Sequence, residues 1–212
     1  MDRLGLTVGE YKFLRTHNTP NKIQDFIEQR LVYNFDTRPN GEATCRSPKL
    51  VLKAGKAHCF EGALLAGAAC IVNGLPAQLM ELTAHKDEEH IVALHWREHK
   101  GIKYRGCMGM SGYHLILYRD AIFRTPRELA LSFASVYHPT RHETRKSLRG
   151  YSAIVDLRRF DTAWLTMREP LDHIGDALGA ARHYGMFPKE FGKDLRPMNA
   201  AVALADARFE GK

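Results

Sequence analysis

Apolar positions recur with two different periods along this chain of 212 residues. In the stretch 59–72, apolar or small residues stand three and four positions apart through three turns, which predicts a helix. Asn73-Gly74 and Pro76 follow, and these residue types end helices. Because Ala and Gly are frequent in the stretch, we expect a central helix that is buried on more than one side.

Outside this helix the pattern predicts further elements. Alternating or extended apolar positions predict strands, at 77–82, 90–96, 102–107, 115–118, 121–123 and 152–157. Helical spacing with Thr-Pro or Pro starts predicts further helices, at 20–31, 125–136 and 170–184. The segment 34–49 contains two prolines and Gly41 and is expected to be irregular.

The order of these elements predicts an α+β fold. Helices come first, then strands, then helices, so the central helix is expected to pack on a mainly antiparallel sheet. The chain length suits one domain with a sizeable core. We expect residues 1–150 to form that core and residues 151–212 to add a strand and a helix that complete the same domain.

Composition narrows the function classes. No apolar run approaches the roughly 20 residues that span a bilayer, and the first residues lack the pattern of a secretory signal. A cytoplasmic location with reduced cysteines is therefore expected. The net charge is +7, but acidic residues are interleaved among the basic ones. We therefore expect neither a membrane nor a nucleic-acid partner; a nucleic-acid binder would need Lys and Arg converging on one face.

Cys59 stands at the predicted start of the central helix. A thiol there faces free backbone N–H groups and the positive end of the helix dipole, and both favour the thiolate. This predicts a nucleophile, although a buried cysteine in that place is also an ordinary core residue. His90 opens a predicted strand after a polar loop, and a histidine is the usual base for a thiol if the fold brings the two together.

The two residues together carry a family resemblance. The segment AHCFEGALLAGAACIVNGLPAQLMEL, followed by DEEHIVAL, resembles the transglutaminase-like fold, a relative of the papain-like cysteine enzymes, in its bacterial stand-alone form. In that family a cysteine begins a buried Ala-rich helix, and a histidine with a D-x-x-H lead-in opens a later strand. Asp87 and His90 stand at that spacing. The resemblance extends over roughly residues 13 to 140, through TPNKIQDFI upstream and FRTPRELALSF downstream.

The resemblance implies acyl transfer through a thioester. Cys59 would attack an amide or ester carbonyl of a peptide, protein or other amide substrate, and His90 would take and return the proton. The backbone N–H of Cys59, with Gln24 as a candidate side-chain donor, would hold the oxyanion. Gln24 is equally well read as a solvent-facing helix residue. A catalytically inactive binding module of the same fold is the alternative.

The third catalytic residue departs from the family pattern. The family commonly places Asp or Asn on the strand after the histidine strand, whereas YRGCMGMSGYH contains neither. Three explanations are open. The imidazole is held by Ser111, a backbone carbonyl or a water; or a residue from elsewhere, such as Asp120, holds it; or the site is degenerate.

The remaining chemistry-bearing residues fit other roles. Cys70 reads as a core residue of the helix, and Cys107 as packed on a strand. The sequence contains no C-x-x-C pair, no H-E-x-x-H motif and no glycine-rich phosphate loop, and no second pair of metal-ligand residues accompanies His138-x-x-x-His142 at a matching spacing. Neither a metal nor a cofactor is expected.

Overall fold

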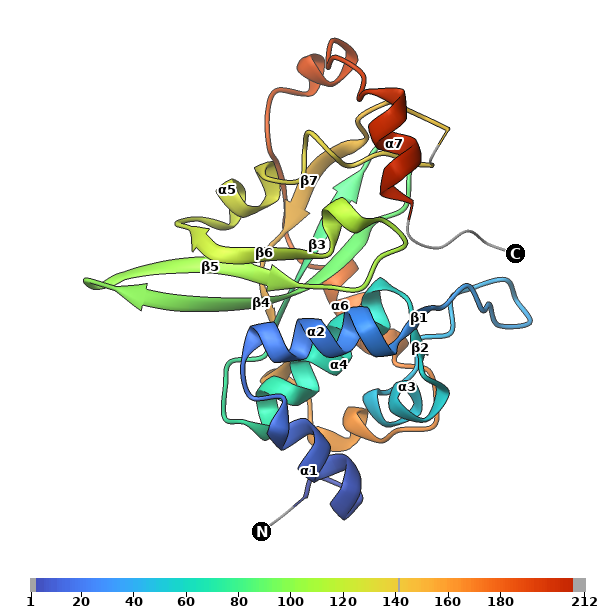
Figure 1. Ribbon diagram of the computed structural model, residues 1–212, viewed down its shortest axis with the longest axis vertical. Helices are drawn as coiled ribbons and strands as arrows, with labels where there is room; N and C mark the ends of the chain where they lie inside the picture. The colour runs from blue at the N-terminus through green and yellow to red at the C-terminus, as the bar shows by residue number, and fades with distance from the viewer. Residues whose placement is uncertain (1–2, 141, 208–212) are drawn as a thin grey trace.

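The computed structural model describes residues 3–140 and 142–207 and contains both helices and a large sheet (Figure 1). The main sheet has seven strands, of which six follow the order β6-β5-β4-β3-β7-β9, while β8 also pairs with β3. Every pairing in this sheet is antiparallel. The strands are β3 (Gln78–Ala84), β4 (His90–His99), β5 (Ile102–Met108), β6 (Tyr118–Phe123), β7 (Leu148–Ser152), β8 (Val155–Asp156) and β9 (His183–Gly185).

Helices and short turns connect these strands. The α-helices are α1 (Val8–Thr16), α2 (Pro20–Arg30), α3 (Pro48–Ala54), α4 (Cys59–Val72), α5 (Pro126–Leu131), α6 (Asp172–Gly179) and α7 (Ala200–Asp206). Single 3-10 turns are η1 (His114–Ile116), η2 (Leu157–Arg159), η3 (Thr162–Leu165) and η4 (Lys189–Lys193). A separate parallel pair joins β1 (Val32–Tyr33) to β2 (Lys56–Ala57), directly before α4.

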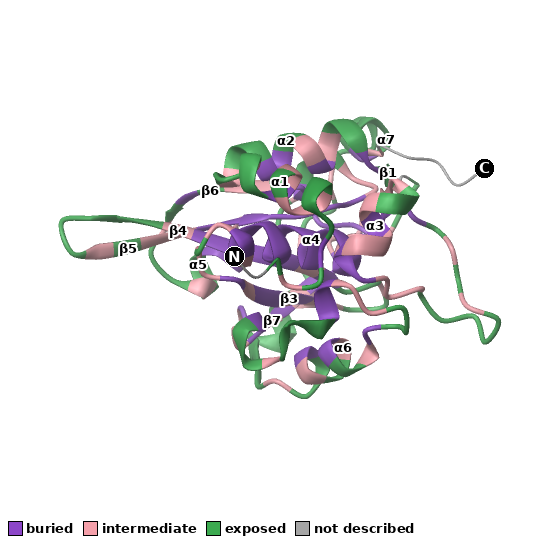
Figure 2. Cartoon of the chain, turned by 90° about the horizontal axis from the view of Figure 1, so that it is seen from below, coloured by how far each residue is buried: buried purple, intermediate pink, exposed green. Residues whose placement is uncertain are grey.

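The helix α4 is the centre of the molecule. All of its residues except Cys59 and Ile71 are buried, as the view in Figure 2 also shows. Its glycines allow close approach on two sides: a Cβ on Gly62 would lie 2.4 Å from the Met110 side chain, and one on Gly67 would lie 2.4 Å from Leu157. The predicted helix and its tight packing are therefore confirmed.

The central part of the sheet is buried on both faces, whereas the far end of the β4–β5 hairpin and the edge strand β9 are exposed. One face carries Leu79 and Ala93 and packs in the same apolar core as α4. The other face carries Val92 and Leu94 and packs in a second core with Phe133, which follows α5. This explains why consecutive residues of β4, which point to opposite faces of the sheet, are apolar. The strand lies between two apolar layers. The predicted α+β class with a mainly antiparallel sheet is confirmed.

Several element predictions need correction. The helix expected over 125–136 ends at Leu131 and continues as turns. The helix expected over 170–184 stops at Gly179, and His183–Gly185 instead joins the edge of the sheet as β9. The expected strand over 152–157 is divided between β7 and β8. Residues 115–118 were expected to be extended, but His114–Ile116 forms the turn η1, which matters for the site described below.

Three helices were missed, namely α1, α3 and α7. The helix α1 begins with a capping box between Thr7 and Glu10, although its apolar stripe is weak. The helix α3 begins at Pro48, at the end of the segment expected to be irregular. All three helices are short, and contacts with the rest of the protein supply what local periodicity does not.

Candidate active site

Cys59 is the first residue of α4 and is partly exposed. The residue before it, His58, is extended and serves as the N-cap. As the first helical residue, Cys59 has a backbone N–H without an intrahelical acceptor. The structure therefore places the thiol where the sequence predicted it, at the N-terminus of a buried helix.

A buried carboxylate holds this helix start in place. Glu61 is fully buried and accepts four hydrogen bonds from residues that precede α4. The donors are Asn34 Nδ2 (2.9 Å), Thr44 Oγ1 (2.7 Å), Arg46 N (2.9 Å) and His58 N (3.2 Å). Sequence reasoning missed this residue, although an acid three positions after an N-cap is a known signature. Its effect is to tie the irregular segment 34–46 to the turn that carries Cys59.

His90 is the first residue of β4 and is almost fully buried. Its Nε2 lies 3.1 Å from the carbonyl oxygen of Ile116, in the turn η1. Because a carbonyl only accepts hydrogen bonds, Nε2 carries the hydrogen. In the neutral ring Nδ1 then has the lone pair, and no hydrogen bond to it occurs in the described part of the chain.

Cys59 and His90 line one cavity of about 1120 Å³. The Cys59 Sγ lies 4.0 Å from the carbonyl oxygen of Glu89, the residue before His90. The backbone of Ile91, the residue after it, also acts on the thiol. Within residues 3–140 and 142–207, no hydrogen bond joins the thiol directly to the His90 ring. The fold thus places Cys59 beside the start of β4, next to the backbone of the two residues that flank His90. The two side chains are not hydrogen-bonded to each other.

The charge states of both groups follow from burial. Burial raises the pKa of the Cys59 thiol to about 11, although hydrogen bonds from the backbone of Ile91 and Phe60 oppose the rise. Burial also lowers the pKa of His90 to about 4, opposed by its bond to Ile116 and assisted by the charge of Arg119. The sequence led us to expect a thiol with a lowered pKa. The direction is the opposite one, because desolvation of the sulfur outweighs the backbone N–H groups of Ile91 and Phe60.

Carboxylates dominate the cavity wall. Among the residues that line it, Asp and Glu outnumber Lys and Arg eight to one, in a protein of net charge +7. Arg38 is the basic residue, and the acids are Asp36, Glu42, Glu81, Asp87, Glu88, Glu89, Asp172 and Asp176. Glu88 lies near enough to Cys59 that its charge contributes to the raised pKa of the thiol. The mouth also carries Phe35, which is 56% exposed and stacks edge-on against Tyr33.

The candidates for the third catalytic residue lie in different places. Ser111 lines the cavity, but its Oγ accepts from the Tyr113 N–H (3.0 Å) and shapes a local turn. Asp120 is exposed on β6, where its charge acts on His95. Of the possibilities left open by the sequence, the backbone carbonyl of Ile116 is the group that the structure places on His90.

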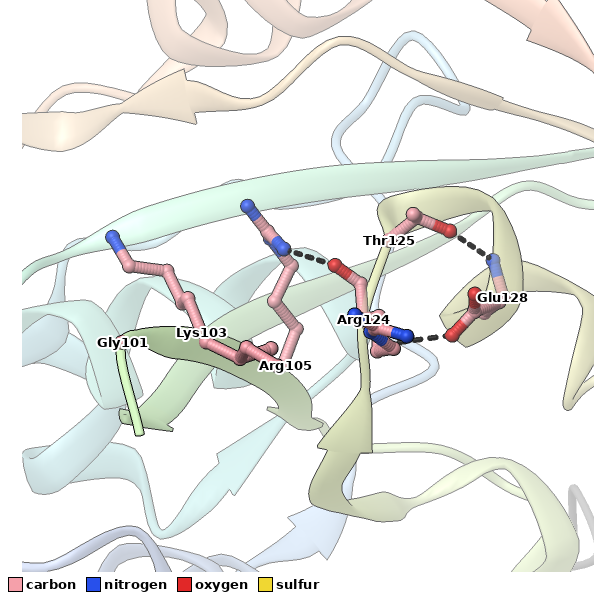
Figure 3. A pocket seen from close by; sticks show the side chains of 7 residues that line it. Gly101, Lys103, Arg105, Arg124, Thr125 and Glu128 are labelled. Atoms are coloured by element: carbon pink, nitrogen blue, oxygen red, sulfur yellow. Dashed lines mark hydrogen bonds between the residues drawn. The ribbon is translucent and has the colours of Figure 1, made fainter. Parts of the chain in front are cut away.

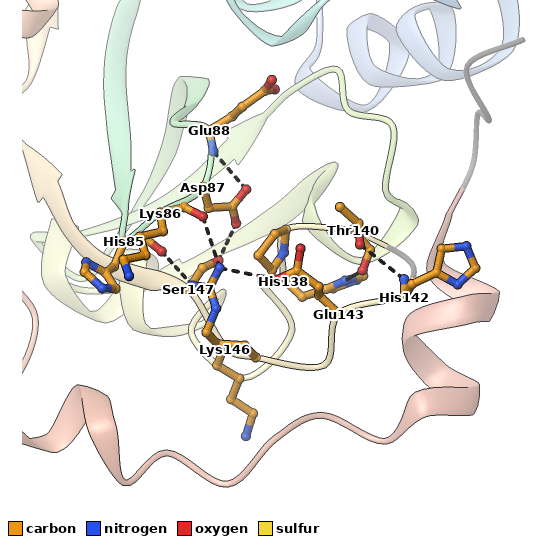
Figure 4. Close-up of polar contacts among 12 residues, drawn as sticks. His85, Lys86, Asp87, Glu88, His138, Thr140, His142, Glu143, Lys146 and Ser147 are labelled. Atoms are coloured by element: carbon orange, nitrogen blue, oxygen red, sulfur yellow. Dashed lines mark hydrogen bonds and ion pairs between the residues drawn. The ribbon is translucent and has the colours of Figure 1, made fainter.

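Asp87, the acid of the D-x-x-H lead-in, braces a loop. Its carboxylate accepts from the Ser147 hydroxyl and from the Glu88 N–H (2.8 Å), as Figure 4 shows. The Tyr137 hydroxyl donates to the Glu88 carbonyl (2.8 Å) from the other side. The polar loop before β4 is therefore fastened to the segments at 137 and 147, and this fixes where His90 begins the strand.

Gln24 is occupied by the protein itself. Its Nε2 donates to Glu28 Oε1 (2.8 Å) and to the Gly109 carbonyl (2.9 Å), while its Oε1 accepts from the Gly109 N–H (3.0 Å). Both amide hydrogens are thus used. Gln24 is buried rather than solvent-facing, and it is not among the residues that line the cavity. In this arrangement it fastens α2 to the residue after β5.

The other cysteines differ in setting. Cys70 is buried in the core around α4, and Cys107 in the core on the other face of the sheet. Cys45 is partly exposed, lines the same cavity as Cys59 and interacts with Asp172. In the part of the chain that the structure describes, no group of three or more His, Cys, Asp or Glu side chains has the arrangement of a metal site.

A second hollow lies away from Cys59, between the β4–β5 hairpin and the start of α5 (Figure 3). It measures about 590 Å³ and is lined by basic side chains, among them Lys103, Arg105 and Arg124. The Arg105 guanidinium donates to the Arg124 carbonyl, and the Lys103 ammonium lies 4.4 Å from the centre of the Trp96 ring. Its lining offers neither a thiol nor an imidazole, so the cavity at Cys59 is the candidate active site.

Comparison with known proteins leaves the family open. No protein-family model matches the chain, and no curated protein matches it in sequence.

Among the described residues, no helix is both long enough and apolar enough to cross a bilayer.

Proposed function

We propose that this protein is a cysteine-dependent acyl-transfer enzyme of transglutaminase-like type, acting on an amide or peptide substrate. The observation that carries the proposal is the shared cavity. Cys59 at the start of α4 and His90 at the start of β4 both line it, and the bond from His90 to Ile116 leaves Nδ1 free to accept a proton.

The chemistry follows from this tautomer. The Cys59 sulfur attacks the substrate carbonyl as its proton passes to His90 Nδ1, and a bond forms between sulfur and the carbonyl carbon. The proton then passes to the departing amine as the carbon–nitrogen bond breaks, which leaves a thioester. Water or a second amine attacks the thioester and restores the thiol. The free N–H of Cys59 at the helix start supports the oxyanion.

Both groups are neutral at rest, so the proton moves during attack rather than before it. A thiol with a pKa of about 11 and an imidazole with a pKa of about 4 do not form an ion pair near neutral pH. This favours general-base catalysis over a preformed thiolate. It also supports the second candidate, a binding module of the same fold that uses the cavity without chemistry.

Trapping the thioester separates the two candidates. The protein would be incubated with p-nitrophenyl acetate, and the acetylated residue mapped by peptide mass spectrometry. We expect acetyl on Cys59, none there in Cys59→Ser, and a rate in His90→Gln lower by about 100-fold. Cys45→Ser is the matched control, because Cys45 lines the same cavity and should not matter.

Two outcomes would favour the binding module. One is acetylation of Cys45 as fast as that of Cys59. The other is a rate at Cys59 that is indifferent to His90. Either would mean that proximity of the two residues has no chemical effect.

A further inference from the structure

The turn that holds His90 is itself held from the C-terminal end of the chain. Asp206, the last residue of α7, is 3% exposed, and its Oδ1 accepts from the Leu115 N–H at 2.7 Å. Leu115 directly precedes Ile116, whose carbonyl binds His90 Nε2. The contact spans 91 positions of the sequence, so no local pattern around His90 points to it.

The same turn is held from its other side by Arg119. The guanidinium of Arg119 donates to the Leu115 carbonyl (2.8 Å) and lies 4.0 Å from the centre of the Phe133 ring. Leu115 is therefore fixed at its N–H by Asp206 and at its carbonyl by Arg119. The Leu115 N–H and carbonyl belong to the two peptide planes on either side of Leu115, so these bonds hold both planes, and only the φ and ψ torsions of Ile116 separate the second plane from the carbonyl that binds His90.

Asp206 is fixed in turn by a buried histidine. Its Oδ2 lies 3.1 Å from His138 Nε2, and His138 Nδ1 lies 2.8 Å from the Thr140 carbonyl. Since both ring nitrogens face oxygen acceptors, the doubly protonated imidazolium satisfies both contacts. The Tyr113 ring packs edge-on against His138 at 4.8 Å, and Tyr113 pairs with Ala207 in an isolated antiparallel bridge. The end of α7 is thus joined to the loop 111–116 at several points.

We infer that Asp206 is a positioning residue for the candidate active site, acting through Leu115 and Ile116 to hold His90 in its Nε2–H tautomer. The inference rests on the proposed function only for its effect on catalysis. The tautomer itself is a property of the resting protein and can be measured without any substrate.

The effect of losing Asp206 follows from the bonds it makes. Without its carboxylate, the Leu115 N–H and His138 lose their acceptor, and the turn is released on one side. The Ile116 carbonyl then no longer selects Nε2–H, so the proton can reside on Nδ1, where it removes the lone pair needed as a base. An asparagine keeps an oxygen for Leu115 and offers an N–H to a neutral His138, so it should restore most of the arrangement.

The test compares Asp206→Ala with Asp206→Asn and with Asn199→Ala. Asn199 caps α7 by accepting from the Ala201 N–H (2.9 Å), so its loss weakens that helix without removing the acceptor of Leu115. Long-range ¹H–¹⁵N spectra of the His90 ring report the tautomer. We expect Nε2–H in the unaltered protein and in Asn199→Ala, mixed tautomers in Asp206→Ala, and recovery in Asp206→Asn. Acetylation of Cys59 should fall about tenfold in Asp206→Ala.

Several results would overturn the inference. An unchanged His90 tautomer in a folded Asp206→Ala protein would do so, and so would an equal change in Asn199→Ala. If Asp206→Ala does not fold, hydrogen exchange of the Leu115 amide in the unaltered protein decides, since exchange as fast as in an exposed loop means that no clamp exists. If the tautomer shifts as expected while Cys59 is never acetylated, the inference stands and the proposed function fails.

Discussion

His90 Nε2 lies 3.1 Å from the carbonyl oxygen of Ile116, and this single contact decides which ring nitrogen is left for chemistry. A side-chain carboxylate in that place would stabilise the protonated ring by its charge. A side-chain amide could turn to present either its oxygen or its nitrogen, so it would fit either tautomer. A backbone carbonyl fixes the tautomer but carries no full charge. Burial outweighs the stabilisation that this carbonyl gives to the protonated ring, so the pKa of His90 is lowered and the ring is neutral near neutral pH.

Acid should destabilise the protein through His90. The pKa of this histidine is lowered from 6.5 to about 4 by burial, so the unfolded chain takes up the proton first. Its contribution to stability is full above pH 6.5 and is lost as the pH falls from there toward 4, to the extent of about 3 kcal/mol. Urea unfolding midpoints measured across this range should fall less steeply in His90→Gln. His99→Gln, on the exposed end of the same strand, should keep the original slope.

Alkylation of Cys59 should be slow near neutral pH. Because burial raises the pKa of the thiol to about 11, the rate with iodoacetamide should keep rising about tenfold per pH unit beyond the value near 8.5 at which an ordinary thiol levels off. The measurement is the rate of modification of each cysteine by mass spectrometry. A plateau for Cys59 at or below the ordinary value would contradict the burial argument and indicate a thiolate at rest.

The charge of a thiol reagent should matter at Cys59. Carboxylates such as Glu88 and Glu89 line the cavity, so a methanethiosulfonate bearing an ammonium group should react several-fold faster than one bearing a sulfonate. The comparison is made in Cys45→Ser, and the difference should shrink at about 1 M salt, where the Debye length is about 3 Å. Replacing both acids by Gln should reduce the ratio. Glu143→Gln, at an exposed acid outside the cavity lining, should not.

Glu61→Gln should destabilise the fold. The four groups that point at this buried carboxylate are all donors, so an amide would place its own N–H₂ against some of them. We expect a loss of about 2–3 kcal/mol in the free energy of unfolding, seen as a lower urea midpoint. Glu42→Gln, at an exposed ion pair with Arg38, should change stability by less than about 1 kcal/mol. Equal effects at the two positions would show that Glu61 does not hold the start of α4.

Gly109→Ala should disturb His90, and Gly112→Ala should not. A Cβ on Gly109 would lie 3.2 Å from the Leu117 carbonyl and 3.4 Å from His90 Nε2, so these groups must move by a few tenths of an ångström. A Cβ on Gly112, although that residue lines the same cavity, meets nothing within 4 Å. We expect acetylation of Cys59 to slow by about tenfold in the first variant only. A similar rate in both would mean that the ring tolerates displacement.

The sequence predicts the helices and strands whose apolar spacing follows from a single buried face. The helix 59–72 and the strand that starts at His90 can be predicted because their apolar residues recur with the period of a helix and of a strand. The helix expected after Thr125 was too long because the residues after Leu131 are apolar for a different reason: Phe133 fills the second core from the turns that follow α5.

The candidate site was predictable only in part. Cys59 and His90 could be singled out because their residue types and their places at element starts are informative. The Ile116 carbonyl could not, because a backbone oxygen leaves no trace in the residue type that carries it. The raised pKa of Cys59 was also out of reach, since the helix terminus is visible in the sequence but the depth of burial is not. Gln24 has the right chemistry for an oxyanion donor, and only its contacts with Glu28 and Gly109 reveal that its hydrogens are used.

The long span between Leu115 and Asp206 has a consequence for how the protein is made. During translation, at about 5–20 residues per second, roughly 5 to 18 seconds separate the synthesis of the two residues, which stand 91 positions apart. The helix that carries the thiol and the strand that carries the imidazole are both synthesised before that interval begins. A nascent chain therefore holds its reactive groups for several seconds before the acceptor of the Leu115 N–H exists.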